Sequence, residues 1–330
     1  MSEPLPSQTV SWLVGQLGEK CEPKLLFADA SFRSYYRIHP PKSWRRAASL
    51  VLMYAPPQKE SLQHYLQLAN DWRAQEVNTP EIIAADARLG LALIEDFGDQ
   101  HLASAEPRQL TDWYLIAFTQ LRAIQGVNPA GLPDFMRDHF PVEMRLLPEW
   151  SDLKIDPHSW RSLCDRLAAE LALMPMLACH RDFHCRNLMR IGDAPNGGAI
   201  GVLDFQDACL GPAVYDLASL VFDAYIRLPE KLVDRLVSSQ AQALGLELPD
   251  LRRQLHLVAL QRLLKVYGIF CRLSKRDHKP RYLAYLPGVG ASIARVGDLL
   301  LEQGERWLKP HQMLFAELAS QARLTAICAQ

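Results

Sequence analysis

The feature that most constrains this chain is a polar run from His180 to Asn187, followed by an acidic segment that begins at Asp204. Between them lie two short apolar stretches, 188–189 and 200–203, on either side of the loop GDAPNGG. This arrangement predicts a β-hairpin with a long connecting loop. Because a hairpin returns its end close to its beginning, we expect Asn187 and Asp204 to face one small site.

Three oxygen-bearing side chains in this region predict phosphoryl transfer from ATP. Asp182 and Asn187 are five residues apart, the separation of the catalytic-loop motif H-R-D-x-x-x-x-N. The carboxylate of Asp204 and the amide oxygen of Asn187 are hard ligands that suit Mg²⁺, which neutralises the triphosphate. Asp182 then stays free of the metal and takes the proton of the acceptor hydroxyl. We therefore expect Asp182 to be the catalytic base.

Two other interpretations of these residues stay open at this point. Asp182 alone is compatible with a turn, and Asp204 alone with an exposed strand end, because aspartate is common in loops. The five-residue step and the hairpin together favour catalysis. A zinc site would instead use Cys179, His180, His184 and Cys185. Zinc is disfavoured because four ligands within seven residues would strain a tetrahedral site.

The first hundred residues predict a small antiparallel sheet with one long helix. Apolar residues recur at helical spacing from Leu62 to Trp72, and a shorter amphipathic pattern covers residues 8–19. Turn-prone residues at 95–99 close the region. Apolar stretches of strand length occur at 24–27, 35–38, 49–54 and 91–94.

Beyond residue 98 the pattern is mainly helical, at 110–124, at 159–173 and from Ala213 onward. We therefore predict an α+β chain with two lobes. Residues 1–98 form the small antiparallel-sheet N-lobe, which binds nucleotide. Residues 99–330 form the larger helical C-lobe, with the catalytic loop and the acceptor site, and the turn at 95–99 is the predicted hinge.

Composition limits the partners and the location that we expect. The net charge of −1 lacks the basic excess typical of nucleic-acid or anionic-membrane binding. Seven cysteines without a C-x-x-C pair favour a reducing compartment over a disulfide framework. The first residues, MSEPLPSQTV, have no basic region followed by an apolar run, so we expect no secretory signal, and no apolar stretch reaches ~18–20 residues. We expect a cytoplasmic protein that binds a small molecule, without a nucleic-acid or membrane partner, and the sequence leaves its oligomeric state open.

At these residues the chain resembles the aminoglycoside phosphotransferase family, which shares the protein-kinase-like two-lobed fold. Four segments resemble, within it, the bacterial kinases that phosphorylate the anomeric hydroxyl of N-acetylmuramate and N-acetylglucosamine in cell-wall recycling. The resemblance implies an ATP- and Mg²⁺-dependent kinase of a sugar hydroxyl. The segments that carry it are 29–37, 180–189, 201–212 and 261–270.

The resemblance also implies roles for individual residues. Asp182 is the implied base, and Asn187 and Asp204 are the implied Mg²⁺ ligands. Asp216 is the residue that braces the catalytic loop, or else an ordinary acid in the first turn of a helix. The nucleotide is implied to contact a phosphate-covering turn and an adenine site at the hinge, formed by Ser31, Phe32, Arg33, Ser34, Glu95 and Phe97.

Two departures from the kinase pattern stand out. The phosphate-covering turn has no glycine, and Met53 lies where protein kinases carry the lysine of their third strand. Arg33, Arg37 and Lys59 are the candidates to replace that charge. The departures leave a catalytically inactive nucleotide-binding regulator as an alternative, but retention of all three catalytic-site residues argues against it.

Residues 262–281 contain seven basic residues and one acidic residue. This local excess of positive charge bears on which acceptor the protein binds. Lys265 lies in an apolar run, where a buried lysine needs an anionic partner. Arg272 follows two helical turns later. This stripe favours an acidic sugar over cationic aminoglycosides or choline, and a kinase of those molecules or of homoserine stays the alternative. The expected substrate-binding residues are His184, Arg186, Lys265 and Arg272.

Overall fold

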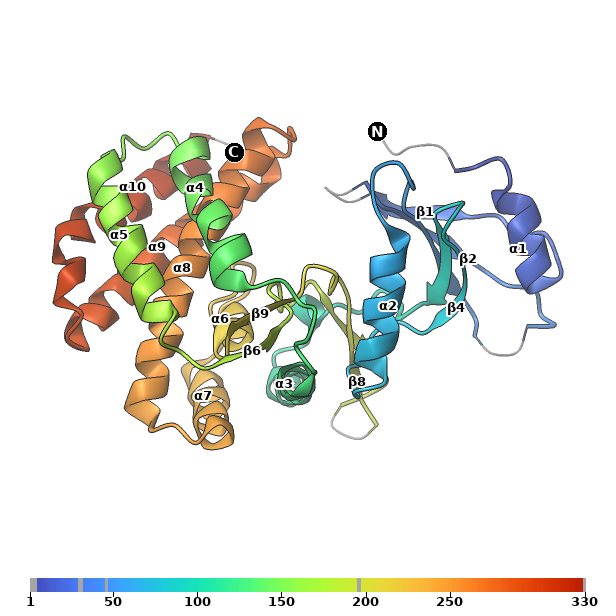
Figure 1. The fold of residues 1–330 in the computed structure, drawn as a ribbon, viewed down its shortest axis with the longest axis horizontal. Helices are drawn as coiled ribbons and strands as arrows, with labels where there is room; N and C mark the ends of the chain where they lie inside the picture. The colour runs from blue at the N-terminus through green and yellow to red at the C-terminus, as the bar shows by residue number, and fades with distance from the viewer. Residues whose placement is uncertain (1–4, 29–31, 45–46, 195–196, 329–330) are drawn as a thin grey trace. The chain divides into compact units, whose positions relative to one another are not determined.

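The computed structural model describes residues 5–28, 32–44, 47–194 and 197–328 (Figure 1). Ser31 therefore lies outside the described residues. The chain divides into two compact units, one of residues 1–123 with 187–206 and one of residues 124–186 with 207–330. The predicted nucleotide-binding lobe ends at residue 98, and this functional boundary stays a prediction.

The first unit contains a five-stranded antiparallel sheet in the order β1-β2-β3-β5-β4. Its strands are β1 (Lys24–Ala28), β2 (Ser34–Ile38), β3 (Leu50–Tyr54), β4 (Ile82–Asp86) and β5 (Leu91–Glu95). The four predicted strands are confirmed. Sequence reasoning missed β4, because its five residues IIAAD carry two alanines and no clear alternation.

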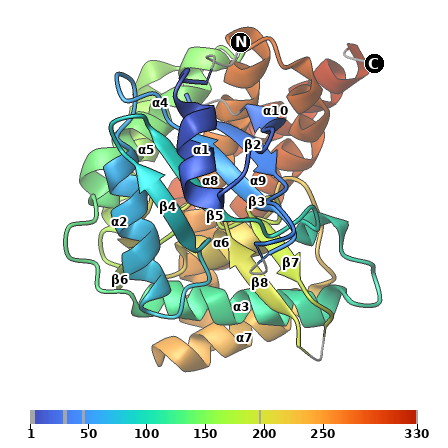
Figure 2. The same cartoon turned by 90° about the vertical axis from the view of Figure 1, so that its right-hand side faces the viewer.

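Helices cover this sheet, and Figure 2 shows α1 (Thr9–Leu17) across one face. Leu13 of α1 belongs to one buried cluster with Leu50 and Leu52 of the central strand β3. All five residues of β3 are buried, so both faces of the sheet are covered at this central strand. The predicted long helix is α2 (Leu62–Arg73), which packs beside β4.

The first unit is completed by a hairpin and by α3 (Leu110–Gly126) as far as residue 123. The hairpin strands are β7 (Leu188–Ile191) and β8 (Ala199–Val202), joined by a loop that contains the GDAPNGG sequence. The short helix η1 (Leu102–Ser104) precedes α3. The predicted hairpin is therefore confirmed.

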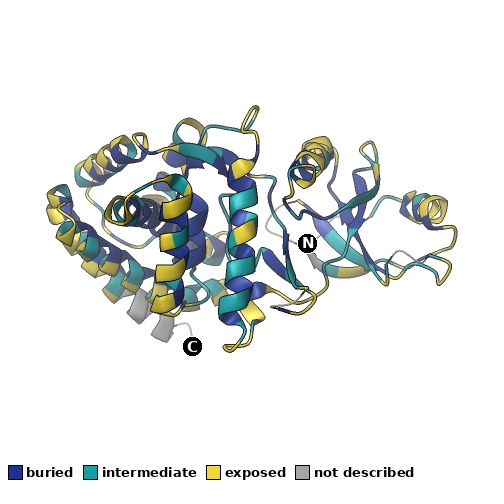
Figure 3. Cartoon of the chain, turned by 90° about the horizontal axis from the view of Figure 1, so that it is seen from below, coloured by how far each residue is buried: buried dark blue, intermediate teal, exposed yellow. Residues whose placement is uncertain are grey.

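The second unit is built around α8 (Leu248–Lys275), which is buried on most of its surface between Leu251 and Leu273. A helix that is apolar on several sides belongs in the middle of a bundle, and α8 packs against α4, α5, α6, α7 and α9. Each of the outer helices has a buried face and an exposed face (Figure 3). The surrounding helices are η2 (Phe135–His139), α4 (Phe140–Trp150), α5 (Pro157–Leu171), α6 (Tyr215–Val221), α7 (Glu230–Leu244), η3 (Pro280–Tyr285), α9 (Leu286–Glu302), η4 (Arg306–His311) and α10 (Gln312–Cys328).

One small sheet interrupts the helices of the second unit. Strand β6 (Met176–Cys179) pairs antiparallel with β9 (Cys209–Pro212). Sequence reasoning missed both strands, because four residues are too few to display a period. Within the described part of the chain, no helix has the length and the apolar character needed to cross a membrane.

Candidate active site

The hairpin holds Asn187 and Asp204 at the same end. Leu188 pairs with Val202, and the Leu203 N–H donates a 2.9 Å hydrogen bond to the Asn187 carbonyl. The ladder therefore places residues that are distant in sequence next to each other, as the spacing predicts. An amide oxygen and a carboxylate in this arrangement are a donor pair that fits Mg²⁺.

The backbone at Asp204 is strained and firmly held. Its φ of +61° lies in the left-handed region, which costs a residue other than glycine roughly 1–3 kcal/mol. The Asp204 Oδ1 accepts a 2.6 Å hydrogen bond from Gln206. Phe205 is fully buried, with its ring centroid 4.9 Å from that of Tyr65 and 5.9 Å from that of Trp72. This packing against α2 offsets the strain, and such strain is typical of functional positions.

Asp216 holds the backbone of the loop that contains Asp182. The Asp216 carboxylate is buried in the first turn of α6 and accepts the N–H groups of His180 at 2.7 Å and Arg181 at 3.0 Å. Arg181 has a φ of +77°, so the two hydrogen bonds hold a strained loop. Burial raises the pKa of Asp216. The predicted brace is therefore present in the structure.

The charge of Asp182 is set by its cationic neighbours. Its side chain is 32% exposed, and its Oδ1 lies 3.5 Å from the Nζ of Lys265. Burial alone would raise the pKa of Asp182, but Lys265 and Arg181 outweigh burial and hold this pKa well below the usual range. Asp182 is consequently ionised at neutral pH, so it can accept a hydrogen bond and a proton.

A second buried acid, Glu143 of α4, supports the same cations. Its Oε1 lies 3.0 Å from Lys265 Nζ and 3.2 Å from Arg181 Nε. Its Oε2 accepts a 2.8 Å hydrogen bond from Gln261. The anionic partners that the sequence requires for Lys265 are thus Glu143 and Asp182. Sequence reasoning missed Glu143, because no helix was predicted at α4.

His184 and Arg186 contact an aromatic cluster. The His184 ring lies 5.4 Å from the ring of Tyr225, and burial lowers the pKa of His184 to about 4, so it is neutral. The Arg186 guanidinium lies 3.6 Å above the Tyr225 ring and donates a 2.6 Å hydrogen bond to the Tyr285 hydroxyl. Both side chains therefore lie beside the same aromatic residue, Tyr225.

Arg272 lies in a different environment from the rest of the predicted acceptor residues. Burial lowers its pKa, Arg276 lowers it further, and Asp277 and Glu149 raise it. Lys265 and Arg272 share a stripe of α8, but seven residues separate them by about 10 Å along the helix axis. The structure therefore brings Lys265 to Asp182 and surrounds Arg272 with other charged groups.

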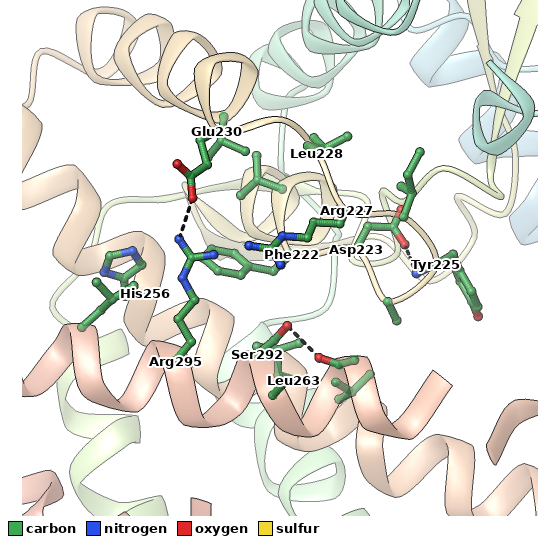
Figure 4. A pocket seen from close by; sticks show the side chains of 18 of the residues that line it. Phe222, Asp223, Tyr225, Arg227, Leu228, Glu230, His256, Leu263, Ser292 and Arg295 are labelled. Carbon is green, nitrogen blue, oxygen red and sulfur yellow. Dashed lines mark hydrogen bonds and ion pairs between the residues drawn. The ribbon is translucent and has the colours of Figure 1, made fainter. Parts of the chain in front are cut away.

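A cavity of about 550 Å³ adjoins the catalytic loop (Figure 4). Its walls come from residues 221–234, α8 and α9. Asp223 and Tyr225 line it, and Asp223 accepts the N–H groups of Cys185 and Tyr225, both at 2.8 Å. Cys185 belongs to the loop that contains Asp182, so Asp223 supports that loop. A molecule in the cavity would therefore contact a residue that supports the catalytic loop. The other polar and aromatic lining residues include Phe222, Arg227, Glu230, His256, Ser292 and Arg295.

In the first unit, the predicted nucleotide residues lie near the start of β2. Phe32 is exposed, with the Lys59 ammonium 4.8 Å from its ring centroid. Arg33 is buried, forms an ion pair with Glu60, and lies 5.3 Å from the ring centroid of Tyr65. Ser34 begins β2 and is buried.

The predicted hinge residues have definite contacts within the same unit. Arg37 binds Asp96 at 2.6 Å and Asp99 at 2.9 Å, so its charge is already balanced. Phe97 lies flat against Gly201 of β8, where any Cβ would collide with the ring. Glu95 ends β5 and lies 3.4 Å from Arg73.

The chain matches the model of the phosphotransferase enzyme family over residues 24–257. It belongs to this family. Two relatives named N-acetylmuramate/N-acetylglucosamine kinase are each 35% identical to it. The relative from Pseudomonas aeruginosa aligns over 79% of this chain and 79% of its own, and that from Neisseria meningitidis over 82% and 86%.

Solved structures agree on the fold of this phosphotransferase. An ethanolamine kinase from Plasmodium vivax superimposes with a TM-score of 0.59 at 11% identity, over 86% of this chain and 83% of that one. The predicted protein-kinase-like α+β fold and the predicted enzyme class are therefore confirmed. Among the residues that the structure describes, no group of three or more histidine, cysteine or acidic side chains is placed to hold a metal ion, so the zinc interpretation gains no support.

Proposed function

We propose that this phosphotransferase transfers the γ-phosphoryl group of ATP to the anomeric hydroxyl of N-acetylmuramate and N-acetylglucosamine. The observation that carries the chemistry is the ionised Asp182 at the end of a braced loop. The acceptor rests on the names of the two relatives and on the extent of their alignment. The expected cytoplasmic location and the role in cell-wall recycling belong to the same proposal.

Asp182 is the proposed base. Its carboxylate accepts a hydrogen bond from the acceptor hydroxyl and receives the proton as transfer proceeds. A strongly acidic carboxyl is sufficient because the transition state is loose, so the base mainly positions the hydroxyl. Lys265 keeps the carboxylate ionised, and Asp216 keeps the loop in place. Positioning of this kind accounts for much of the catalysis of phosphoryl transfer.

Asn187 and Asp204 are the proposed ligands of Mg²⁺. Their oxygens suit this hard cation, and the hairpin holds their backbones together without help from the metal. When bound, Mg²⁺ supplies positive charge to the phosphate oxygens of ATP. The strained backbone of Asp204 orients the carboxylate in advance, which lowers the cost of binding.

Arg33 is the proposed replacement for the missing strand-three lysine. Protein kinases pair that lysine with a glutamate, and Arg33 pairs with Glu60, which lies just before α2. Arg37 is committed to Asp96 and Asp99, and Lys59 lies over an exposed ring. We propose that Ser31, Phe32 and Ser34 also contact the phosphates, and that adenine binds near Glu95 and Phe97.

The cavity in the second unit is the proposed site for the body of the sugar. Its volume of about 550 Å³ accommodates a monosaccharide. The rings of Phe222 and Tyr225 offer faces for the apolar side of a pyranose, and Asp223 and Ser292 offer hydrogen-bonding groups. Tyr225 also contacts His184, so one lining residue of the cavity touches the loop that contains Asp182.

The experiment is an acceptor panel scored by ADP release. We expect turnover of both amino sugars, and none of kanamycin, choline or homoserine above background. A sugar-1-phosphate product that is labile in acid would identify the anomeric hydroxyl. Preferential turnover of kanamycin or choline would reject the acceptor and leave the phosphotransferase assignment intact.

A further inference from the structure

Arg262 of α8 is a buried cation that pairs with no acid in the part of the chain that the structure describes. Its side chain is 2% exposed, and among the described residues it forms no ion pair and no hydrogen bond. Both Nε and Nη1 are enclosed and unpartnered. A guanidinium stays protonated in proteins, and burial of an unpaired charge is costly. Such a charge needs a compensating partner, which a bound anionic ligand can supply.

The neighbours of Arg262 are the groups of the proposed acceptor site. It lies one helical turn before Lys265, on the same side of α8. It is close enough to lower the pKa of Asp182, of His184 and of Tyr225. Arg262 therefore lies close to the catalytic loop, and the next residue of α8, Leu263, lines the cavity.

The protein's own carboxylates at this site are already engaged. Glu143 pairs with both Lys265 and Arg181, and Asp182 pairs with Lys265. Two cations, Lys265 and Arg181, thus take up these two carboxylates in ion-pair contact. The Nε and Nη1 groups of Arg262 are hydrogen-bond donors that neither of these carboxylates satisfies.

We infer that Arg262 is the centre of a carboxylate-binding subsite for the acceptor. This inference rests on the proposed function, because N-acetylmuramate carries a lactyl carboxylate that N-acetylglucosamine lacks. The planar fork of arginine binds a carboxylate through two parallel hydrogen bonds. Arg262 thus gives N-acetylmuramate an interaction that N-acetylglucosamine cannot make, and it determines the preference between the two sugars.

This assignment differs from the residues that the sequence suggests. Lys265 has its charge balanced by Glu143 and Asp182, so it positions the base. Arg272 is influenced by Arg276 and Asp277 rather than by the catalytic loop. Of these three cations of α8, Arg262 combines near-complete burial with the lack of an ion-pair partner among the described residues.

The test compares the wild type with Arg262→Met and Arg262→Lys in the full chain. Steady-state kinetics are measured with N-acetylmuramate, its uncharged carboxamide and N-acetylglucosamine, together with a binding titration of each sugar without ATP. Methionine keeps the length of the stem and removes the charge. Arg272→Met is the matched control, an arginine of the same helix with different neighbours.

We expect Arg262→Met to lower the ratio of kcat/KM for N-acetylmuramate to that for N-acetylglucosamine by about ten- to hundredfold, the usual effect of a lost charged hydrogen bond. The wild type should prefer the acid to its carboxamide, and Arg262→Met should not. Arg262→Lys should fall between them, and Arg272→Met should leave the ratio within twofold of wild type.

Equal losses with both sugars, or a wild type that binds the acid and the carboxamide equally, would overturn the inference. The second comparison needs no variant, so it decides even if Arg262→Met does not fold. Absence of turnover with both sugars would instead refute the proposed function. The binding titrations would then still decide whether Arg262 recognises a carboxylate.

Discussion

Replacement of Asp216 by alanine tests how the catalytic loop is held. The change removes two charge-assisted hydrogen bonds, to the N–H groups of His180 and Arg181. Each is worth roughly 1.5–3 kcal/mol, but the raised pKa of Asp216 shows that burial of the carboxylate has a cost of its own. We therefore take the low end and expect a loss of about 3 kcal/mol in the free energy of unfolding. At roughly 2 °C per kcal/mol for a chain of this size, Tm falls by about 6 °C.

The same change should slow catalysis, because the loop that positions Asp182 is released. A displacement of about 1 Å at a reacting group costs about a hundredfold in kcat, whereas the KM for ATP should change little. Calorimetry and steady-state kinetics measure the two effects. Asp152→Ala is the control, since its ion pair with Lys275 is largely exposed and is worth at most about 1 kcal/mol. An Asp216→Ala variant with kcat within twofold of wild type would refute the bracing role.

Three further predictions concern the nucleotide, the metal and the cavity. Arg33→Met should raise the KM for ATP about tenfold or more through loss of one charged contact, with the KM for sugar unchanged; equal changes in both would point to general damage. Titration of Mg-ATP should show a larger loss of affinity for Asp204→Ala than for Asn187→Ala, because only the carboxylate carries charge; the reverse order would contradict the assignment. Ala291→Trp should fill the cavity and raise the KM for sugar at least tenfold, whereas Asp298→Trp, exposed on the same helix and outside the cavity, should not; sugar kinetics decide between them.

The sequence predicts the parts of this site that are encoded locally. The five-residue step from Asp182 to Asn187 and the turn-rich loop of the hairpin are short-range patterns, and the hairpin alone determines that Asn187 meets Asp204. The sheet of the first unit is predictable for the same reason, since β2, β3 and β5 are separate apolar stretches. Strands β4, β6 and β9 are too short or too weakly patterned to be predicted.

The charge network in the second unit could not be predicted, because it depends on packing between distant helices. An acid in α4, a cation in α8 and a cation in the catalytic loop become neighbours only when the second unit folds. The sequence indicates that Lys265 needs an anionic partner, and the structure supplies Glu143 and Asp182. The sequence gives no reason to separate Arg262 from the other basic residues nearby. Arg262 is distinguished by its burial, and burial is a property of the fold.

The most direct test of the account is turnover of N-acetylmuramate and N-acetylglucosamine by Asp182→Asn, measured alongside its affinity for Mg-ATP and its Tm. Asparagine keeps the shape of the side chain and removes the proton acceptor. The account predicts that kcat falls by ~10²–10⁴-fold with both sugars, while the affinity for Mg-ATP stays near that of the wild type; the Tm falls, because the ion pair of Asp182 with Lys265 is lost. A variant that keeps more than half of the wild-type turnover would contradict it.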